Sequence, residues 1–148
     1  MADVRERLFI RTALEAEIAA EAARRMTRAD KQALATNLHE IESAAAADDK
    51  ESFYALDVAF HQNLTSRLGM VRAAEILDGL RVHLERVRRL MMSPGGRMRE
   101  TCTEHASIAE AIEACDPAAA REAMTRHLGA TSAMLETFSR ERPMLFSP

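Results

Sequence analysis

The chain contains no tryptophan, one tyrosine, five glycines, four prolines and two cysteines among its 148 residues. Two cysteines, Cys102 and Cys115, do not provide a disulfide framework, which favours a reduced cytoplasmic setting. No apolar run approaches the roughly 20 residues that a membrane-spanning helix needs. The first nine residues, MADVRERLF, also lack the apolar segment of a secretory signal. These absences favour a cytoplasmic protein that has no contact with a membrane.

The abundant residue types are those that favour helices, namely alanine, leucine, glutamate, arginine and methionine. Hydrophobic residues make up 47% of the chain, and 148 residues suffice for a single domain with a buried core. The formal net charge of −3 lacks the basic excess that a nucleic-acid-binding domain usually carries. The composition therefore predicts one helical domain and does not indicate that this chain itself binds DNA.

Apolar residues recur at helical spacing along almost the whole chain, and they predict six helices and no strands. The expected boundaries are about 3–25, 28–46, 50–68, 71–92, 98–115 and 117–140. Thr27, Asp49 and Asp116 are predicted N-caps, 93–96 is the clearest break, and 142–148 is predicted to be irregular. Short connections favour antiparallel neighbours, so we expect an all-α antiparallel bundle. The chain begins directly with a strong helix, which suggests a domain separated from a longer protein.

Four polar residues interrupt the apolar stripes of three predicted helices. Asp57 and His61 are four residues apart on one helix and therefore point the same way. His105 and His127 lie on two later helices, each on the face that should be buried. One carboxylate and three imidazoles turned into a core cost free energy unless something binds them. A divalent transition metal would satisfy all four, and Zn, Ni, Mn and Fe(II) all suit this set.

Each of these residues also has a structural explanation when it is taken alone. A single inward histidine is more often a hydrogen-bonded core residue than a ligand, and an inward aspartate is often the partner of an arginine. Cys102 shares a face with His105, so it is either a thiolate ligand or a small buried apolar residue. The sequence leaves a polar core network open beside the metal site.

The first helix carries a second polar interruption. Arg11 and Glu15 lie in the centre of its apolar face. One interpretation is an ion pair between residues four apart, partly exposed at the end of the bundle. The other is that Arg11 points into a cavity and binds a carboxylate, because its planar fork suits bidentate capture.

A series of short motifs follows in order along the chain. The motifs are Arg11-Thr12-Ala13-Leu14-Glu15, Phe53, Asp57-Val58-Ala59-Phe60-His61, Glu104-His105-Ala106-Ser107-Ile108, Ala111-Ile112, Asp116-Pro117-Ala118-Ala119-Ala120, Met124 and His127-Leu128. Together, from about Arg5 to Phe138, they resemble the FCD domain, the C-terminal effector-binding domain of the FadR subfamily of GntR-type transcription regulators.

The resemblance implies an antiparallel helical bundle that forms a homodimer, with residues 1–148 as a single FCD-like domain. It implies metal ligands at Asp57, His61, His105 and His127, with zinc as the expected ion and nickel, manganese or iron as alternatives. It also implies a small organic acid beside the metal, held by Arg11 with Glu15 next to it. DNA would be bound only through a winged helix–turn–helix domain, whose signature this sequence does not contain.

Three functions are compatible with these features. The predicted one is a sensor, in which the bound acid shifts the packing of the first and fourth helices and so moves attached DNA-binding domains across a dimer. The alternative is a metal-dependent helical-bundle enzyme acting on a small organic acid, with Glu15 as the candidate base. The third is a dimerisation module whose polar core residues pair among themselves and bind no metal. We expect the sensor and no enzyme activity.

Overall fold

The computed structural model describes residues 2–91 and 95–141, without the side chains at 2–3, 82–91, 95–96 and 139. It contains the helices α1 (Ala2–Arg25), α2 (Arg28–Ala46), α3 (Lys50–Arg67), α4 (Val71–Met91), α5 (Gly95–Glu113) and α6 (Pro117–Glu141). Those ranges contain no strand, so the predicted all-α fold is confirmed. None of the described helices is both long enough and apolar enough to cross a bilayer.

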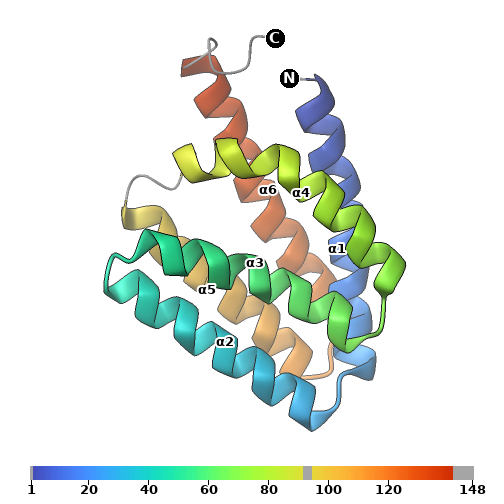
Figure 1. Cartoon of the computed structure of the whole chain (residues 1–148). Coiled ribbons are helices and arrows are strands. Elements are labelled where there is room, and N and C mark those ends of the chain that lie inside the picture. Colours follow the sequence, from blue (N-terminus) through green and yellow to red (C-terminus); the bar gives the residue numbers. More distant parts are fainter. Residues whose placement is uncertain (1, 92–94, 142–148) are drawn as a thin grey trace.

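The helices form an antiparallel bundle (Figure 1). α1 and α6 run side by side in opposite directions, and α6 also packs on α5. α2 contacts both α3 and α5, while α4 crosses over α1 and α6 and also contacts α3. The predicted ligands lie on α3, α5 and α6. All three helices pack on α1, so the ligands face one shared core.

Local sequence signals fix several helix ends. Thr27 caps α2: its side chain accepts a hydrogen bond from the N–H of Asp30, and Asp30 in turn accepts one from the N–H of Thr27. This reciprocal capping box satisfies two N–H groups that the helix leaves unpaired. Asp116 accepts hydrogen bonds from two N–H groups in the first turn of α6. Gly69 follows α3 with φ of +68°, a conformation that glycine adopts without a steric cost.

The ends of α5 differ from the prediction. α5 begins at Gly95 rather than near Met98, because first-turn N–H groups need no intrahelical partner and glycine is tolerated there. It ends at Glu113, and Cys115 has φ of +55°. Cys115 donates its N–H to the Ile112 carbonyl at 3.1 Å, and the next N–H bonds the Ala111 carbonyl at 3.0 Å. This Schellman-type ending usually carries glycine at its left-handed position, so the sequence did not reveal it. The predicted break at 93–94 and the predicted irregular segment 142–148 lie outside the described residues.

The core between α1 and α6 is built largely from alanine. Ala19 and Ala22 on α1 and Ala120 on α6 are fully buried. Small side chains allow two helices to approach closely, since the separation of helix axes depends on the side chains at the contact. The predicted stripe of α3 is also confirmed, with Phe53 and Phe60 fully buried.

Candidate metal centre

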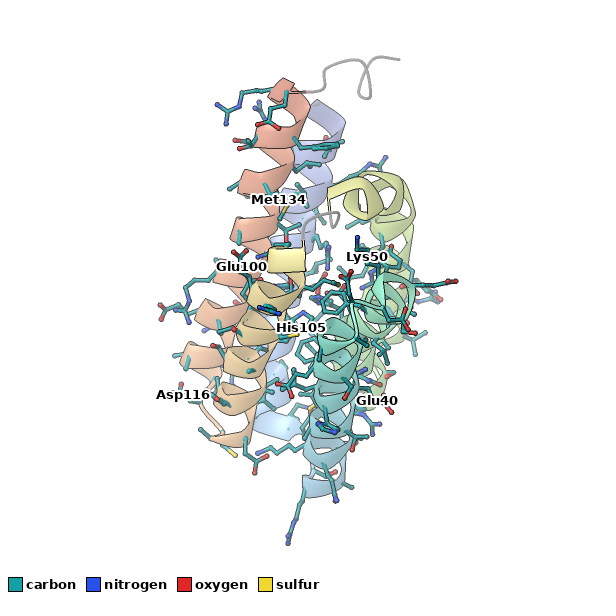
Figure 2. All side chains as sticks on the ribbon, turned by 90° about the vertical axis from the view of Figure 1, so that its left-hand side faces the viewer. Glu40, Lys50, Glu100, His105, Asp116 and Met134 are labelled. Carbon is teal, nitrogen blue, oxygen red and sulfur yellow. The ribbon has the colours of Figure 1, made fainter. Side chains whose placement is uncertain are left out.

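The structure buries all four predicted metal ligands. Asp57 and His105 have no exposed surface, and His127 and His61 are 1% and 2% exposed. His61 and Asp57 are both buried on α3, as their spacing of four residues predicts. His105 lies partway along α5 (Figure 2). The inward orientation that the helical spacing predicted is therefore observed at each position, while metal binding by these residues stays a prediction.

The three imidazoles converge from three different helices. One ring nitrogen from each of His61, His105 and His127 lies within 4.8 Å of those of the other two. The Nε2 atoms of His61 and His127 are 3.3 Å apart. Two ligand nitrogens on a tetrahedral zinc ion, with bonds of about 2.05 Å, are separated by about 3.3 Å. The Nε2 atoms of His61 and His127 therefore already have the spacing that one shared metal ion requires.

Asp57 lies at the edge of this group rather than within it. Its Oδ1 is 3.5 Å from Nε2 of His105, and it does not belong to the compact set formed by the three histidines. Phe60, one turn away from Asp57, stacks its ring on His105 with centroids 4.0 Å apart and an interplanar angle of 5°. Packing by Phe60 therefore fixes the plane of the His105 ring beside the Asp57 carboxylate.

Glu15 contacts the ring nitrogen of His61 that points away from the other two histidines. Its carboxylate contacts Nδ1 of His61 and also accepts a hydrogen bond of 2.5 Å from Nε of Arg11. Burial by itself raises the pKa of Glu15, but the charges of Arg11 and His61 and their hydrogen bonds outweigh it and hold the pKa well below its usual value. Glu15 is therefore ionised at neutral pH, where it accepts the hydrogen bond from Arg11 and contacts Nδ1 of His61 as an anion.

Glu104 contacts the corresponding ring nitrogen of His127, Nδ1. One carboxylate oxygen lies 2.7 Å from Nδ1 of His127. Arg97 donates two hydrogen bonds to this carboxylate, at 2.6 and 2.9 Å. Partial burial by itself raises the pKa of Glu104, but its hydrogen bonds with His127 and Arg97 and their charges lower it overall. Glu104 is therefore also an ionised acceptor.

The contacts with Glu15 and Glu104 determine which ring nitrogen of His61 and of His127 can bind a metal. An ionised carboxylate only accepts, so a ring beside it donates from Nδ1, and in its neutral form it keeps the lone pair on Nε2. Burial lowers the pKa of His61 to about 4, so this ring is neutral at pH 7. The Nε2 atoms of the two rings face each other at 3.3 Å, so a cation bound beside both could take a lone pair from each ring. The donor set therefore fits a transition metal.

Arg11 lies deeper than the exposed ion-pair interpretation expected. The ion pair with Glu15 is present, but the two side chains are only 2% and 3% exposed. Among the described residues, Nη2 of Arg11 has no hydrogen-bond partner although it is buried. The negative charge of Asp57 also acts on Arg11. The pair therefore borders the candidate metal centre instead of closing the end of the bundle.

Two residues of this site were not identified from the sequence. They are Arg97 and Glu104, which lie seven residues apart and therefore on one face of α5. Glu104 occurs in the motif Glu104-His105-Ala106-Ser107-Ile108, but no role was predicted for it. Cys102, the weaker candidate ligand, is half-buried and does not join the histidine group in the described part of the chain. Burial raises the pKa of its thiol, so the small apolar interpretation fits Cys102 better than a thiolate ligand.

The chain is similar to several known regulators. It is 31% identical over 147 residues to the HTH-type transcriptional repressor RspR of Escherichia coli K12 and to the regulator YdfH of Shigella flexneri. These matches cover 99% of the chain and 64% of each relative, so the chain spans less than two thirds of their length. A solved structure named Streptococcus agalactiae GntR superposes with a TM-score of 0.75 at 26% identity, covering 88% of this chain and 58% of that one.

The relatives carry the names of transcription regulators rather than of enzymes. The metal-dependent enzyme considered above therefore gains no support. The sequence model of the FCD domain family matches residues 6–130. This range includes every residue of the candidate centre. The chain thus belongs to the FCD domain family, and its relatives carry the names of transcription regulators.

Proposed function

We propose that this chain is a ligand-sensing domain that binds one divalent transition metal, with zinc as the first choice, through His61, His105, His127 and Asp57. The observation that carries the proposal is the pair of carboxylate-held imidazoles whose Nε2 atoms face each other at 3.3 Å. Three imidazoles and one carboxylate are a donor set that suits zinc and related ions. The bound metal would supply an anchor for an anionic ligand.

The proposed effector is a small organic acid whose carboxylate lies between the metal and Arg11. Arg11 keeps a buried N–H at Nη2 that the described residues do not satisfy. A carboxylate would accept from it with a charge-assisted hydrogen bond. Glu15 serves as the orienting partner, because it already binds Nε of Arg11 and Nδ1 of His61.

Transmission is proposed to run through α1. This helix carries Arg11 and Glu15, and it packs on α4 and α6 as well as on α3 and α5. A ligand that prefers one packing of α1 and α4 shifts the population toward it. In a homodimer in the cytoplasm, this shift would move helix–turn–helix domains of the kind that the relatives' names record, and those domains would contact DNA.

The metal is tested by measuring the metal content of the purified chain by mass spectrometry, beside the double variant His105→Ala, His127→Ala. We expect about one ion per chain in the wild type, since the four donors form a single site, and none in the variant. A wild type that stays empty after reconstitution with Zn, Ni and Mn would refute the metal site.

The effector is tested by thermal shift with a panel of dicarboxylic and hydroxy acids on the metal-loaded chain. We expect stabilisation that disappears in Arg11→Leu and after chelation of the metal. Operator binding by a full-length regulator that contains this domain, measured with and without the acid, then tests the sensing role. Unchanged operator affinity would contradict it.

A further inference from the structure

We propose that Glu104 is a positioning residue: held in place by Arg97, it fixes the Nδ1–H of His127 and so aims Nε2 of that ring into the metal centre. This inference rests on the proposed metal-binding function. It assigns a role to two residues outside the predicted ligand set. It also identifies which side of the centre is adjacent to solvent.

Arg97, Glu104 and His127 form a chain of successive hydrogen bonds. The guanidinium of Arg97 engages both carboxylate oxygens of Glu104, a bidentate contact that fixes the carboxylate plane. One of these oxygens lies 2.7 Å from Nδ1 of His127. The opposite nitrogen of the same ring faces His61 at 3.3 Å. The contact of Glu104 with Nδ1 thus sets both the tautomer and the orientation of the His127 ring.

The same arrangement occurs on the second histidine, built from a different helix. Arg11 binds Glu15, and Glu15 binds Nδ1 of His61. Two arginine–carboxylate pairs therefore hold two imidazoles whose Nε2 atoms face each other. In metal sites, a carboxylate on the far nitrogen of a histidine sets its tautomer and raises its basicity as a ligand.

The two carboxylates differ in their exposure. The side chain of Glu15 is 3% exposed, whereas that of Glu104 is 22% exposed. Glu104 lines a surface hollow of about 280 Å³ between α5 and α6, together with Glu100, Thr103, Arg126 and His127. Glu104 therefore stands between solvent and His127. Without it, water from the hollow would reach Nδ1, and either tautomer of His127 would be accessible.

Glu100 provides a matched control. It lies on the same helix as His105, nearer its start (Figure 2), and it lines the same hollow as Glu104. It also accepts a hydrogen bond from Arg97, at 3.4 Å. Its carboxylate contacts Arg97 but makes no hydrogen bond to His127 in the described structure. Replacing Glu100 thus removes a nearby negative charge without removing the partner of Nδ1.

The first experiment measures Zn²⁺ affinity by competition with a chromogenic chelator for the wild-type chain and for Glu104→Ala, Glu104→Gln and Glu100→Ala. We expect Glu104→Ala to lower the affinity about 10- to 100-fold, the usual effect of losing a partner of a ligand. Glutamine keeps an oxygen acceptor for Nδ1–H, so Glu104→Gln should retain most of the affinity. Glu100→Ala should match the wild type. Equal losses in Glu104→Ala and Glu100→Ala, or in Glu104→Ala and Glu104→Gln, would overturn the proposal, because they would show an effect of charge alone.

The second experiment needs no metal. Long-range ¹H–¹⁵N NMR spectra of the metal-free chain report the tautomer of His127, identified by its loss in His127→Gln. We expect the Nδ1–H form in the wild type and in Glu104→Gln, and a mixture of forms in Glu104→Ala. An unchanged tautomer in Glu104→Ala would overturn the positioning role. If the wild-type chain binds no Zn²⁺, the proposed metal centre fails, and this measurement still decides whether Glu104 positions His127.

Discussion

Replacing Arg11 with leucine removes the cation that faces Glu15 in the core. The two side chains are 2% and 3% exposed, with Nε and Oε1 2.5 Å apart. Removing one partner of a buried ion pair costs about 3–5 kcal/mol, because the other charge stays buried without compensation. Glu15 keeps its contact with His61, so we expect a loss near the lower end, about 3 kcal/mol. For a chain of this length, that loss lowers the melting temperature by roughly 6–12 °C.

The measurement is urea unfolding followed by circular dichroism at pH 7 in the presence of a chelator. Arg24→Leu is the control, since Arg24 forms an ion pair with Glu21 on the same helix but with its side chain 44% exposed. Exposed pairs contribute about 0.2–1 kcal/mol or less. Because the folded-state pKa of Glu15 is depressed, the advantage of the wild type should also shrink as the pH falls through that pKa. Equal losses in the two variants at pH 7 would refute the reasoning.

Three further predictions concern the metal, the core and the helix caps. Free Zn²⁺ at 100 times its dissociation constant should raise the free energy of unfolding by about 2.7 kcal/mol; a shift that persists in the variant His105→Ala, His127→Ala would contradict the assignment. Phe60→Ala should cost about 3–5 kcal/mol in chemical denaturation, because Phe60 is fully buried and stacks on His105; a loss below that of an exposed Phe9→Ala control would contradict it. Hydrogen bonds from Thr27 lower the pKa of Asp30, so Asp30 should contribute stability above pH 4 or so that is lost as the pH falls through its folded pKa; an Asp30→Asn variant whose acid unfolding curve matches the wild type would contradict this.

The inward placement of the histidines could be predicted from the sequence, because helical periodicity alone decides which face of a helix His105 and His127 occupy. The caps at Thr27 and Asp116 were predictable for a similar reason, since their hydrogen bonds reach only two or three residues along the chain. Such local signals determined most of the helix ends. The left-handed residue Cys115 is an exception, as is the start of α5 at Gly95, and the conformation of Cys115 is set by the helix ending and not by its residue type.

The pairing within the site could not be predicted in this way. Glu15 meets His61, and Glu104 meets His127, across different helices, and periodicity does not specify how neighbouring helices are aligned along their axes. The burial of Arg11 depends on the same alignment. The sequence therefore could not exclude the interpretation that Arg11 and Glu15 form an exposed ion pair. Which nitrogen of each imidazole faces inward depends on these contacts, so it required the three-dimensional structure.

Glu15 is shared between the residue proposed to bind the effector and a residue proposed to bind the metal. An effector that draws Arg11 toward itself changes how firmly Glu15 holds His61, so the two binding events are energetically linked. By thermodynamic reciprocity, the factor by which the effector changes metal affinity equals the factor by which the metal changes effector affinity. A coupling of about 1.4 kcal/mol would make that factor tenfold. With a positive coupling of this size, such a regulator would respond to about tenfold lower effector concentrations in a cell that also supplies the metal.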